Sequence, residues 1–378
     1  VYDGDGIQVI DANTDGVPDK PAAALLRSSQ VSFYDAQDRV FRTQELFVDQ
    51  ATGALGTSRL TTNMFYDRRG NVAAVFAPNA PVSQSRYDGA GRLTTSLTLG
   101  NVPAATWASA TSVAASLILE QTDYTYDAAS NVILTTNRQR FHDASTSALG
   151  VLGTPTTGIP ARVSYAASYY DAADRLTASV NVGTNGGVAY VRPATVPARS
   201  DTALVTTFSY DTAGRVQDVT DPNGIIARTL YDDLGRTTAT IANFTGAAPG
   251  SQTDVTTVFS FDSSGRLASR TAVQGAGTPS QTTGYVYGVS AATGSAIASN
   301  DLMAETRYPD PVSGLPSATD RDIYTSNALG ERTSFTDRAG TTHTYAYDVT
   351  GRQTADAITA LGTGVDPAIR RIESAYDA

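Results

Sequence analysis

One short segment near the start of the chain carries oxygen atoms at the spacing of a calcium loop. The sequence DANTDGVPD places carboxylate or amide oxygens around a glycine bend at Asp11, Asn13, Asp15 and Asp19. Calcium takes about six to eight oxygen ligands, and the D-x-N-x-D-G spacing suits such a loop. Ala22 stands where an EF-hand has its bidentate glutamate, so we expect modest affinity. An Asx-rich turn without metal is an equal alternative.

Other residues that could carry catalysis form no recognisable constellation. His142 and His343 are the two histidines of the chain, and they stand far apart in the sequence without a helical H-x-x-x-H partner. There is no cysteine, nucleophile elbow, phosphate loop or dinucleotide fingerprint. Aspartates could supply a glycosidase pair, but nearly all of them lie in a repeated turn where they have a structural role. We therefore expect no enzyme activity and no catalytic residue.

A six-residue pattern, Y-D-x-x-G-R, returns along the chain and is its dominant feature. We number its positions one (Tyr) to six (Arg). The defining residues of the four clear copies are Tyr87, Asp88, Gly91 and Arg92; Tyr210, Asp211, Gly214 and Arg215; Tyr231, Asp232, Gly235 and Arg236; and Tyr347, Asp348, Gly351 and Arg352. Looser copies begin at Tyr34, Tyr66, Tyr126, Tyr170 and Phe261, and Tyr376 begins a further one. The segment from Asn327 to Glu331 keeps positions two to six of the turn without the tyrosine.

Each position of the motif has a physical role in a tight hairpin. Aspartate can accept backbone N–H groups within the turn, and glycine adopts positive φ without a steric penalty. The tyrosine before the turn and the arginine after it should lie close across the two strands and stack. Aromatic residues two apart precede several turns, as at Tyr124 and Tyr126, so one face of each hairpin should be aromatic. The unit is strand, turn, strand, turn.

With these motifs the chain resembles the YD-repeat or Rhs-repeat family. That family includes bacterial Rhs toxins, the shell-forming subunits of insecticidal toxin complexes, and teneurin-like surface proteins. The resemblance implies an all-β fold of tandem β-hairpins that form a coiled, spiral β-sheet, as the wall of a shell or tube. The toxin members end in an Rhs core with an aspartyl self-cleavage motif and a variable toxic domain, and this sequence has neither. It looks most like a fragment of a very long bacterial surface protein with the same repeat.

The repeats are unevenly spaced, which predicts inserted loops or extra strands. The organisation we expect is a possible calcium loop or connection over 1–22, followed over 23–378 by about ten repeats. The stretch from Ala104 to Glu120 could form one short helix with Trp107, Val113, Leu117 and Ile118 facing inward. The expected inserts are rich in Gly, Ala, Pro, Ser and Thr, and they cover 100–121, 139–162, 183–204, 242–255 and 288–322.

Composition excludes several kinds of partner. The formal net charge of -10 and the isoelectric point near 4.7 disfavour binding to nucleic acid or to anionic lipid. No stretch approaches the roughly 20 apolar residues of a membrane span. With 32 glycines, 16 prolines and 19 tyrosines, the chain has the profile of many turns and half-buried strands.

Three functions follow as hypotheses. The leading one is a non-enzymatic extracellular or cell-surface structural protein, which forms a filament, tube or sheath by self-association or by continuing into further repeats. Incomplete motifs at both ends favour it, because a stack can continue into a neighbour and hide its edge strands. The second is the wall of a toxin-encapsulating cocoon. The third is an adhesion module that binds glycan or protein through the inserted loops, whose removal should leave the fold intact.

Overall fold

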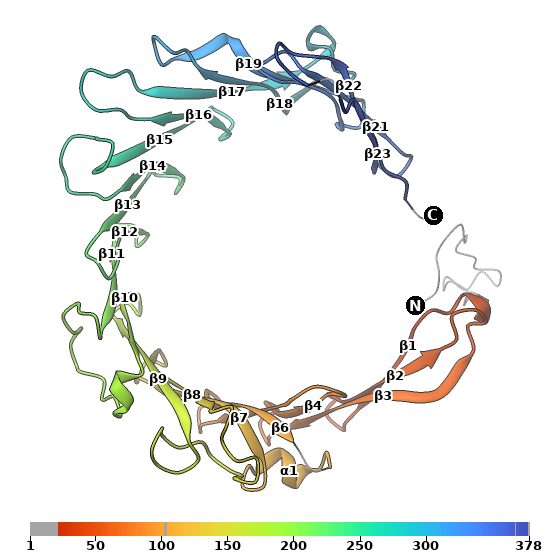
Figure 1. Cartoon of the computed structure of the whole chain (residues 1–378), viewed down its shortest axis with the longest axis vertical. Helices are drawn as coiled ribbons and strands as arrows, with labels where there is room; N and C mark the ends of the chain where they lie inside the picture. Colours follow the sequence, from red (N-terminus) through yellow and green to blue (C-terminus); the bar gives the residue numbers. More distant parts are fainter. Residues whose placement is uncertain (1–21, 102–103, 367, 377–378) are drawn as a thin grey trace. The chain divides into compact units, whose positions relative to one another are not determined.

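The computed structural model describes residues 22–101, 104–366 and 368–376, and it confirms the predicted all-β class. Hydrogen bonds join the 23 strands of these ranges into one open sheet, in which neighbouring strands pair antiparallel. The chain divides into two compact units, the first reaching Thr207 and the second beginning at Phe208. Figure 1 labels most of the strands of both units. Among the described residues, no helix is long and apolar enough to cross a membrane.

The first unit contains β1 to β10 and most of β11. Its strands are β1 (Ser29–Tyr34), β2 (Val40–Val48), β3 (Leu55–Tyr66), β4 (Val72–Phe76), β5 (Val82–Tyr87), β6 (Leu93–Asn101), β7 (Leu117–Tyr126), β8 (Val132–Arg140), β9 (Ala161–Tyr170), β10 (Leu176–Gly183) and β11 (Leu204–Tyr210). Its short helices are η1 (Ala23–Leu25), α1 (Trp107–Thr111) and η2 (Asn185–Gly187).

The second unit continues the same alternation of strands and turns. Its strands are β12 (Val216–Thr220), β13 (Ile226–Tyr231), β14 (Thr237–Ala242), β15 (Val255–Phe261), β16 (Leu267–Ala272), β17 (Gln281–Val289), β18 (Ser299–Pro309), β19 (Pro316–Ser326), β20 (Arg332–Thr336), β21 (Thr342–Tyr347), β22 (Gln353–Ala360) and β23 (Arg371–Glu373). Its described residues also form the short helix η3 (Ala291–Thr293).

Every motif turn closes a hairpin between sequential strands. In the second unit, for example, β13 pairs with β14 and β14 pairs with β15, each antiparallel. Because strand direction alternates, every second connection lies at the same edge of the sheet. The Y-D turns therefore share one edge within each unit, which we call the turn edge.

Motif hairpins also contain a β-bulge, which the sequence did not predict. Tyr231 pairs with Thr237, but Leu230 pairs with Ala239, so Thr238 is an extra residue on the returning strand. The same register shift next to the position-one aromatic occurs in the hairpins of Tyr34, Tyr66, Tyr87, Tyr126, Tyr170, Phe261 and Tyr347. In two hairpins the extra residue is a threonine whose hydroxyl donates to the carbonyl before the tyrosine, at Thr94 and Thr177.

Inserted loops of the first unit pack onto its sheet and build its core. The loop around α1 contributes Ala110 and Val113, and the 141–160 connection contributes Leu152, to a cluster that contains Leu99 and Ile118. A second cluster joins β9, β10 and β11 to the 184–203 connection. The inserts therefore bury apolar side chains that a single-layer sheet would expose.

The expected helix over 104–120 was largely wrong. The α-helix has five residues, Trp107–Thr111, and Leu117 and Ile118 belong to β7. Val113 is buried as expected, but Trp107 is 51% exposed. Threonine and serine favour capping over helix continuation, and here Thr106 and Ser109 form a capping box around a single turn.

Over 288–322, the expected insert consists of extra strands and not of a loop. This range contains the end of β17, helix η3, all of β18 and more than half of β19, so it is mainly a further hairpin. The structure places connections at 141–160, 184–203 and 243–254, between β8 and β9, β10 and β11, and β14 and β15. The expected insert over 100–121 contains α1 but also the ends of β6 and β7.

Candidate functional site

The aspartate of each motif organises its own turn. Asp88 Oδ1 accepts the backbone N–H groups of Ala90 at 2.8 Å and Arg92 at 3.0 Å, and Asp88 Oδ2 accepts Arg92 Nε at 2.7 Å. Gly91 has φ of 83°, which allows the chain to reverse direction here. The same aspartate–arginine pair recurs with aspartates 35, 171, 211, 232, 262 and 348.

These contacts change the acidity of the aspartates. The backbone N–H and guanidinium of Arg92 hold the pKa of Asp88 below its ordinary value, and Arg215 does the same for the pKa of Asp211. Hydrogen bonds to the ionised form favour it over the neutral acid. At neutral pH the motif aspartates are therefore fixed anions at the turn edge.

The motif arginine does not stack on the tyrosine of its own hairpin, so that prediction was wrong. The Arg92 guanidinium lies 4.7 Å from the ring centroid of Tyr126, the position-one tyrosine of the next copy. The bulge and the sheet twist leave the arginine closer to the following hairpin than to its own. The other pairs, at 4.4 to 4.7 Å, are Arg39 with Tyr66, Arg215 with Tyr231, Arg236 with Phe261, Arg266 with Tyr287 and Arg352 with Tyr376.

The hydroxyl of the stacked tyrosine also bonds to the hairpin that provides the arginine. Tyr126 donates to the carbonyl of Leu93, which directly follows Arg92, at 2.6 Å. In seven described tyrosines the hydroxyl donates, at 2.6 to 3.2 Å, to the backbone carbonyl of the residue after position six of the preceding copy. The pairs are Tyr66 with Val40, Tyr87 with Val72, Tyr126 with Leu93, Tyr170 with Val132, Tyr231 with Val216, Tyr347 with Arg332, and Tyr376 with Gln353. We call this seat, made by the position-six side chain and the next carbonyl, the tyrosine seat.

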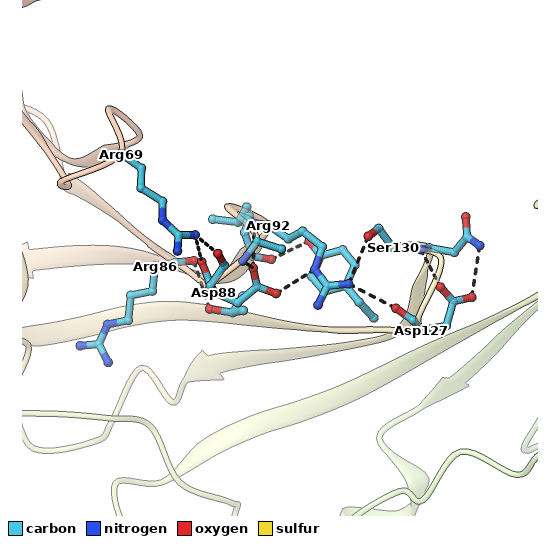
Figure 2. A network of polar contacts seen from close by, with 12 residues as sticks. Arg69, Arg86, Asp88, Arg92, Asp127 and Ser130 are labelled. Carbon is cyan, nitrogen blue, oxygen red and sulfur yellow. Dashed lines mark hydrogen bonds and ion pairs between the residues drawn. The ribbon is translucent and has the colours of Figure 1, made fainter. Parts of the chain in front are cut away.

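Polar contacts also link consecutive turns directly, and Figure 2 shows this chain in the first unit. Arg69 Nη1 donates to the carbonyls of Asp88 and Gly89 in the next turn. Arg92 Nη1 donates to the Asp127 carbonyl and to Ser130 Oγ, each at 3.2 Å. In the second unit, Arg215 donates to the Asp232 carbonyl at 2.7 Å.

Copies that depart from the consensus keep part of this arrangement. Asn71 and Asn131 replace the arginine and bond their own aspartates, so Tyr87 and Tyr170 keep the hydroxyl bond without a stacked guanidinium from position six. Phe261 keeps the stacked Arg236 but has no hydroxyl. Asn131 additionally donates to Asp174 Oδ1 in the following turn at 2.9 Å.

A second polar cluster of the second unit lies on strands β18 and β19 and in the turn that follows β20. Asp322 is 7% exposed and accepts the hydroxyl of Tyr308 at 2.7 Å and the backbone N–H of Arg338 at 3.0 Å. The Arg338 guanidinium covers the Tyr308 ring at 4.5 Å and pairs with Asp320. The hydrogen bond to Asp322 raises the pKa of Tyr308 to about 12. These groups satisfy one another, as in a structural network.

The two histidines lie in different units. His343 Nδ1 is 2.8 Å from Asp356 Oδ1, and its ring lies between Phe335 and Tyr345 in an aromatic row. His142 lies in the connection between β8 and β9. The described part of the chain holds no group of three or more His, Cys, Asp or Glu residues that could bind a metal ion.

The candidate calcium loop, Asp11, Asn13, Asp15 and Asp19, lies outside the described residues. The structure brings the aspartate and arginine of the motif together within one turn, and the arginine and tyrosine together between neighbouring hairpins. Sequence reasoning missed the tyrosine seat and the Asp322 cluster. The residue after position six varies in type between copies, and it contributes only its backbone carbonyl. Its side chain therefore does not reveal the contact in the sequence.

Comparisons with known proteins do not place the chain in a family. No family model matches it, and no curated protein matches it. Solved structures similar to it include the TcdB2-TccC3-Cdc42 crystal structure (14% identity, TM-score 0.30, 89% of this chain and 19% of that chain). The Tc holotoxin pore of Photorhabdus luminescens gives 14% identity and a TM-score of 0.31, and also covers 89% of this chain and 19% of that one. The chain spans about a fifth of those chains.

A porin-like protein from Bacteroides uniformis is similar at 10% identity with a TM-score of 0.16, over 83% of this chain and 92% of that chain. TM-scores this low do not establish a shared fold with any of these proteins.

Proposed function

We propose that this chain is a non-enzymatic structural protein whose hairpins form part of an extracellular or cell-surface filament, tube or sheath. The observation that carries the proposal is the tyrosine seat, which recurs between neighbouring hairpins along both units. The seat uses the aspartate, arginine and tyrosine that dominate the sequence, so the repeated residues act in cohesion of the sheet.

The same use of residues supports the proposal that there is no catalytic role. A catalytic site needs unlike groups that converge on a substrate, with at least one held ready for reaction. In the motif, the carboxylate already accepts two backbone N–H groups and a guanidinium, and the phenol already donates to a carbonyl. Calcium bound by residues 11–19 is the one cofactor that we include in this proposal.

Electron microscopy of the native full-length protein, with and without a calcium chelator, tests this function. Long fibres or tubes with a regular repeat are the expected result, and their loss with chelator would assign the calcium loop a role. Closed, discrete capsules with internal density would contradict the filament and favour a cocoon wall. Discrete monomers that bind glycan or protein saturably would favour the adhesion module.

A further inference from the structure

A pocket in the sheet of the first unit is lined by side chains that form hydrogen bonds but carry no charge. It has a volume of about 390 Å³ and lies across β8, β9 and β10. The hydrogen-bonding side chains of its lining residues are Thr135, Asn137, Ser164, Ser168, Ser179 and Asn181. Small ligands bind in concavities of roughly 300 to 1,000 Å³. The pocket is therefore large enough for one small ligand.

Strand register places these side chains on one face of the sheet. Asn137 pairs directly with Ser164, and Ser168 pairs directly with Ser179. Directly opposed residues of antiparallel strands point to the same face, and so do residues two apart on one strand. The other face carries Ala167, which is 1% exposed and belongs to the second apolar cluster. The pocket therefore lies on a layer that is held in place by packing behind it.

Most of these side chains have no hydrogen-bond partner within the described part of the chain. Asn181 accepts the backbone N–H of Gly183 at 2.9 Å, and it is the exception among the six. Asn137 Oδ1 is buried and accepts no hydrogen bond from the described residues. Opposed hydroxyl residues elsewhere in the sheet do bond each other, as Ser260 and Ser269 do at 2.6 Å. The pocket therefore combines several hydrogen-bonding groups that the fold itself does not use.

The lining favours a neutral ligand with several hydroxyl groups. A ligand that enters must replace the hydrogen bonds that water makes to these side chains, which a polyol can do and an apolar molecule cannot. An ionic ligand would lose hydration without gaining a counter-charge, because no charged residue is among the described residues of the lining. Polar lining without charge therefore selects hydroxyl groups over carboxylate or phosphate groups.

An aromatic ring stands beside the pocket. Tyr124 on β7 pairs directly with Thr135, so its side chain lies on the same face of the sheet as the lining residues. Aromatic side chains combine a large apolar surface with, in tyrosine, a polar end. Such a ring suits the apolar C–H face of a pyranose, whose edges carry the hydroxyl groups.

We propose that this pocket binds a neutral saccharide. Hydroxyl and amide groups of β8, β9 and β10 bond the sugar hydroxyls, and the ring of Tyr124 packs against the sugar. The site is separate from the proposed structural function, because none of its lining residues belongs to a tyrosine seat or a motif turn. It is also separate from the adhesion hypothesis of the inserted loops, because strands form it.

Saturation-transfer difference NMR on the 378-residue chain tests the proposal. The probes are glucose, galactose, mannose and N-acetylglucosamine, with glucuronate as the charged comparison. At least one neutral sugar should receive saturation from the protein, and titration gives its affinity. Glucuronate should give a weaker signal, because the lining offers no cation to its carboxylate.

Two variants locate the site. Ala166 lies in the pocket and is exposed, so Ala166→Leu should block sugar binding without disturbing the core on the other face. Ala172→Leu, the same change at an exposed turn tip, is the matched control and should bind as the native chain does. Asn137→Ala removes an unused acceptor, so it should weaken binding about twofold to tenfold without lowering the free energy of unfolding in urea.

Three results would overturn the proposal. These are no saturation transfer to any neutral sugar, a stronger signal for glucuronate than for every neutral sugar, and unchanged binding in Ala166→Leu. Circular dichroism checks that each variant is folded. If Ala166→Leu does not fold, Asn137→Ala decides, and unchanged sugar binding in that variant would reject the site. Fibres seen by electron microscopy would leave the structural function standing whichever result is obtained.

Discussion

At the scale of single residues, a motif tyrosine gains its environment from the copy before it. Tyr231 has the Arg215 guanidinium on its ring and the Val216 carbonyl at its hydroxyl. A cation–π contact contributes roughly 0.5 to 1 kcal/mol at exposed sites, and a hydrogen bond roughly 0.5 to 1.5 kcal/mol. Each departure from the consensus therefore has a definable energetic cost.

Phe261 offers a gain-of-stability variant. Phe261 already stacks on Arg236. The hydroxyl that Phe261→Tyr adds should donate to the carbonyl of Thr237, as the Tyr231 hydroxyl donates to the carbonyl of Val216. We expect the free energy of unfolding to rise by roughly 0.5 to 1 kcal/mol, measured by urea denaturation. Phe259→Tyr, two residues earlier, is the control and should give no such gain. A decrease for Phe261→Tyr would mean that the seat does not accept a hydroxyl at this copy.

Asp38 tests the requirement for positive φ in the turn. This residue occupies the glycine position of its copy with φ of 57°, a conformation that costs an L-residue energy. Asp38→Gly should stabilise the chain by roughly 0.5 to 1 kcal/mol, seen as a higher melting temperature. Ala213→Gly, which lies before a turn glycine, is the control and should be neutral or destabilising. Equal effects of the two substitutions would contradict strain at Asp38.

At the scale of elements, the turn was readable from sequence and the neighbour contact was not. The pattern Asp-x-x-Gly fixes hydrogen bonds within five residues, so Asp88 and Gly91 could be assigned their roles directly. The arginine and tyrosine that stack, Arg92 and Tyr126, belong to different hairpins separated by β6, an insert and β7. Their meeting depends on a bulge and on strand order. Propensity also failed at 104–120, where packing against the sheet decided the structure.

The turns should also determine the acid stability of the sheet. The pKa of Asp88 and of Asp211 is lowered in the folded state, so folding releases protons when pH falls toward the ordinary aspartate pKa of about 3.9. Their contribution to stability is complete above that value and is lost as pH falls through the lowered pKa. Thermal melts should therefore be nearly constant from about pH 7 to 5 and decline below about pH 4. A steep loss of stability between pH 7 and 5 would contradict this assignment.

The inserts of the first unit are part of its core. We therefore do not expect them to be removable without loss of stability, as loops that serve only in binding would be. Leu152 is 3% exposed in the 141–160 connection and packs with Ile118. Leu152→Ala should lower the free energy of unfolding by about 2 to 4 kcal/mol. The exposed Trp107 provides the comparison, and Trp107→Ala should cost less. If Leu152→Ala is as stable as the native chain, the insert does not support the sheet, and deletion of 139–162 would leave folding intact as first expected.

At the scale of the whole molecule, repeated contacts between nearest neighbours provide cohesion without one large core. In the described part of the second unit, the buried hydrophobic side chains are few and small: Ala239, Val289, Ala304 and Ala355. Backbone ladders and tyrosine seats must therefore contribute much of its stability, as nearest-neighbour terms do in repeat proteins. In each seat the arginine contacts the next copy along the chain, and the tyrosine hydroxyl bonds to the preceding copy. These contacts therefore have the same direction along the sheet.

Double-mutant cycles at Arg92 test this central claim most directly. Arg92→Ala is combined with Tyr126→Ala in one cycle and with Tyr87→Ala in the other, and unfolding free energies are measured in urea. Contact between neighbouring copies predicts a coupling of roughly 0.5 to 1 kcal/mol for Arg92 with Tyr126 and additivity for Arg92 with Tyr87, the tyrosine of its own hairpin. Coupling confined to Tyr87, or absent from both pairs, would contradict the account.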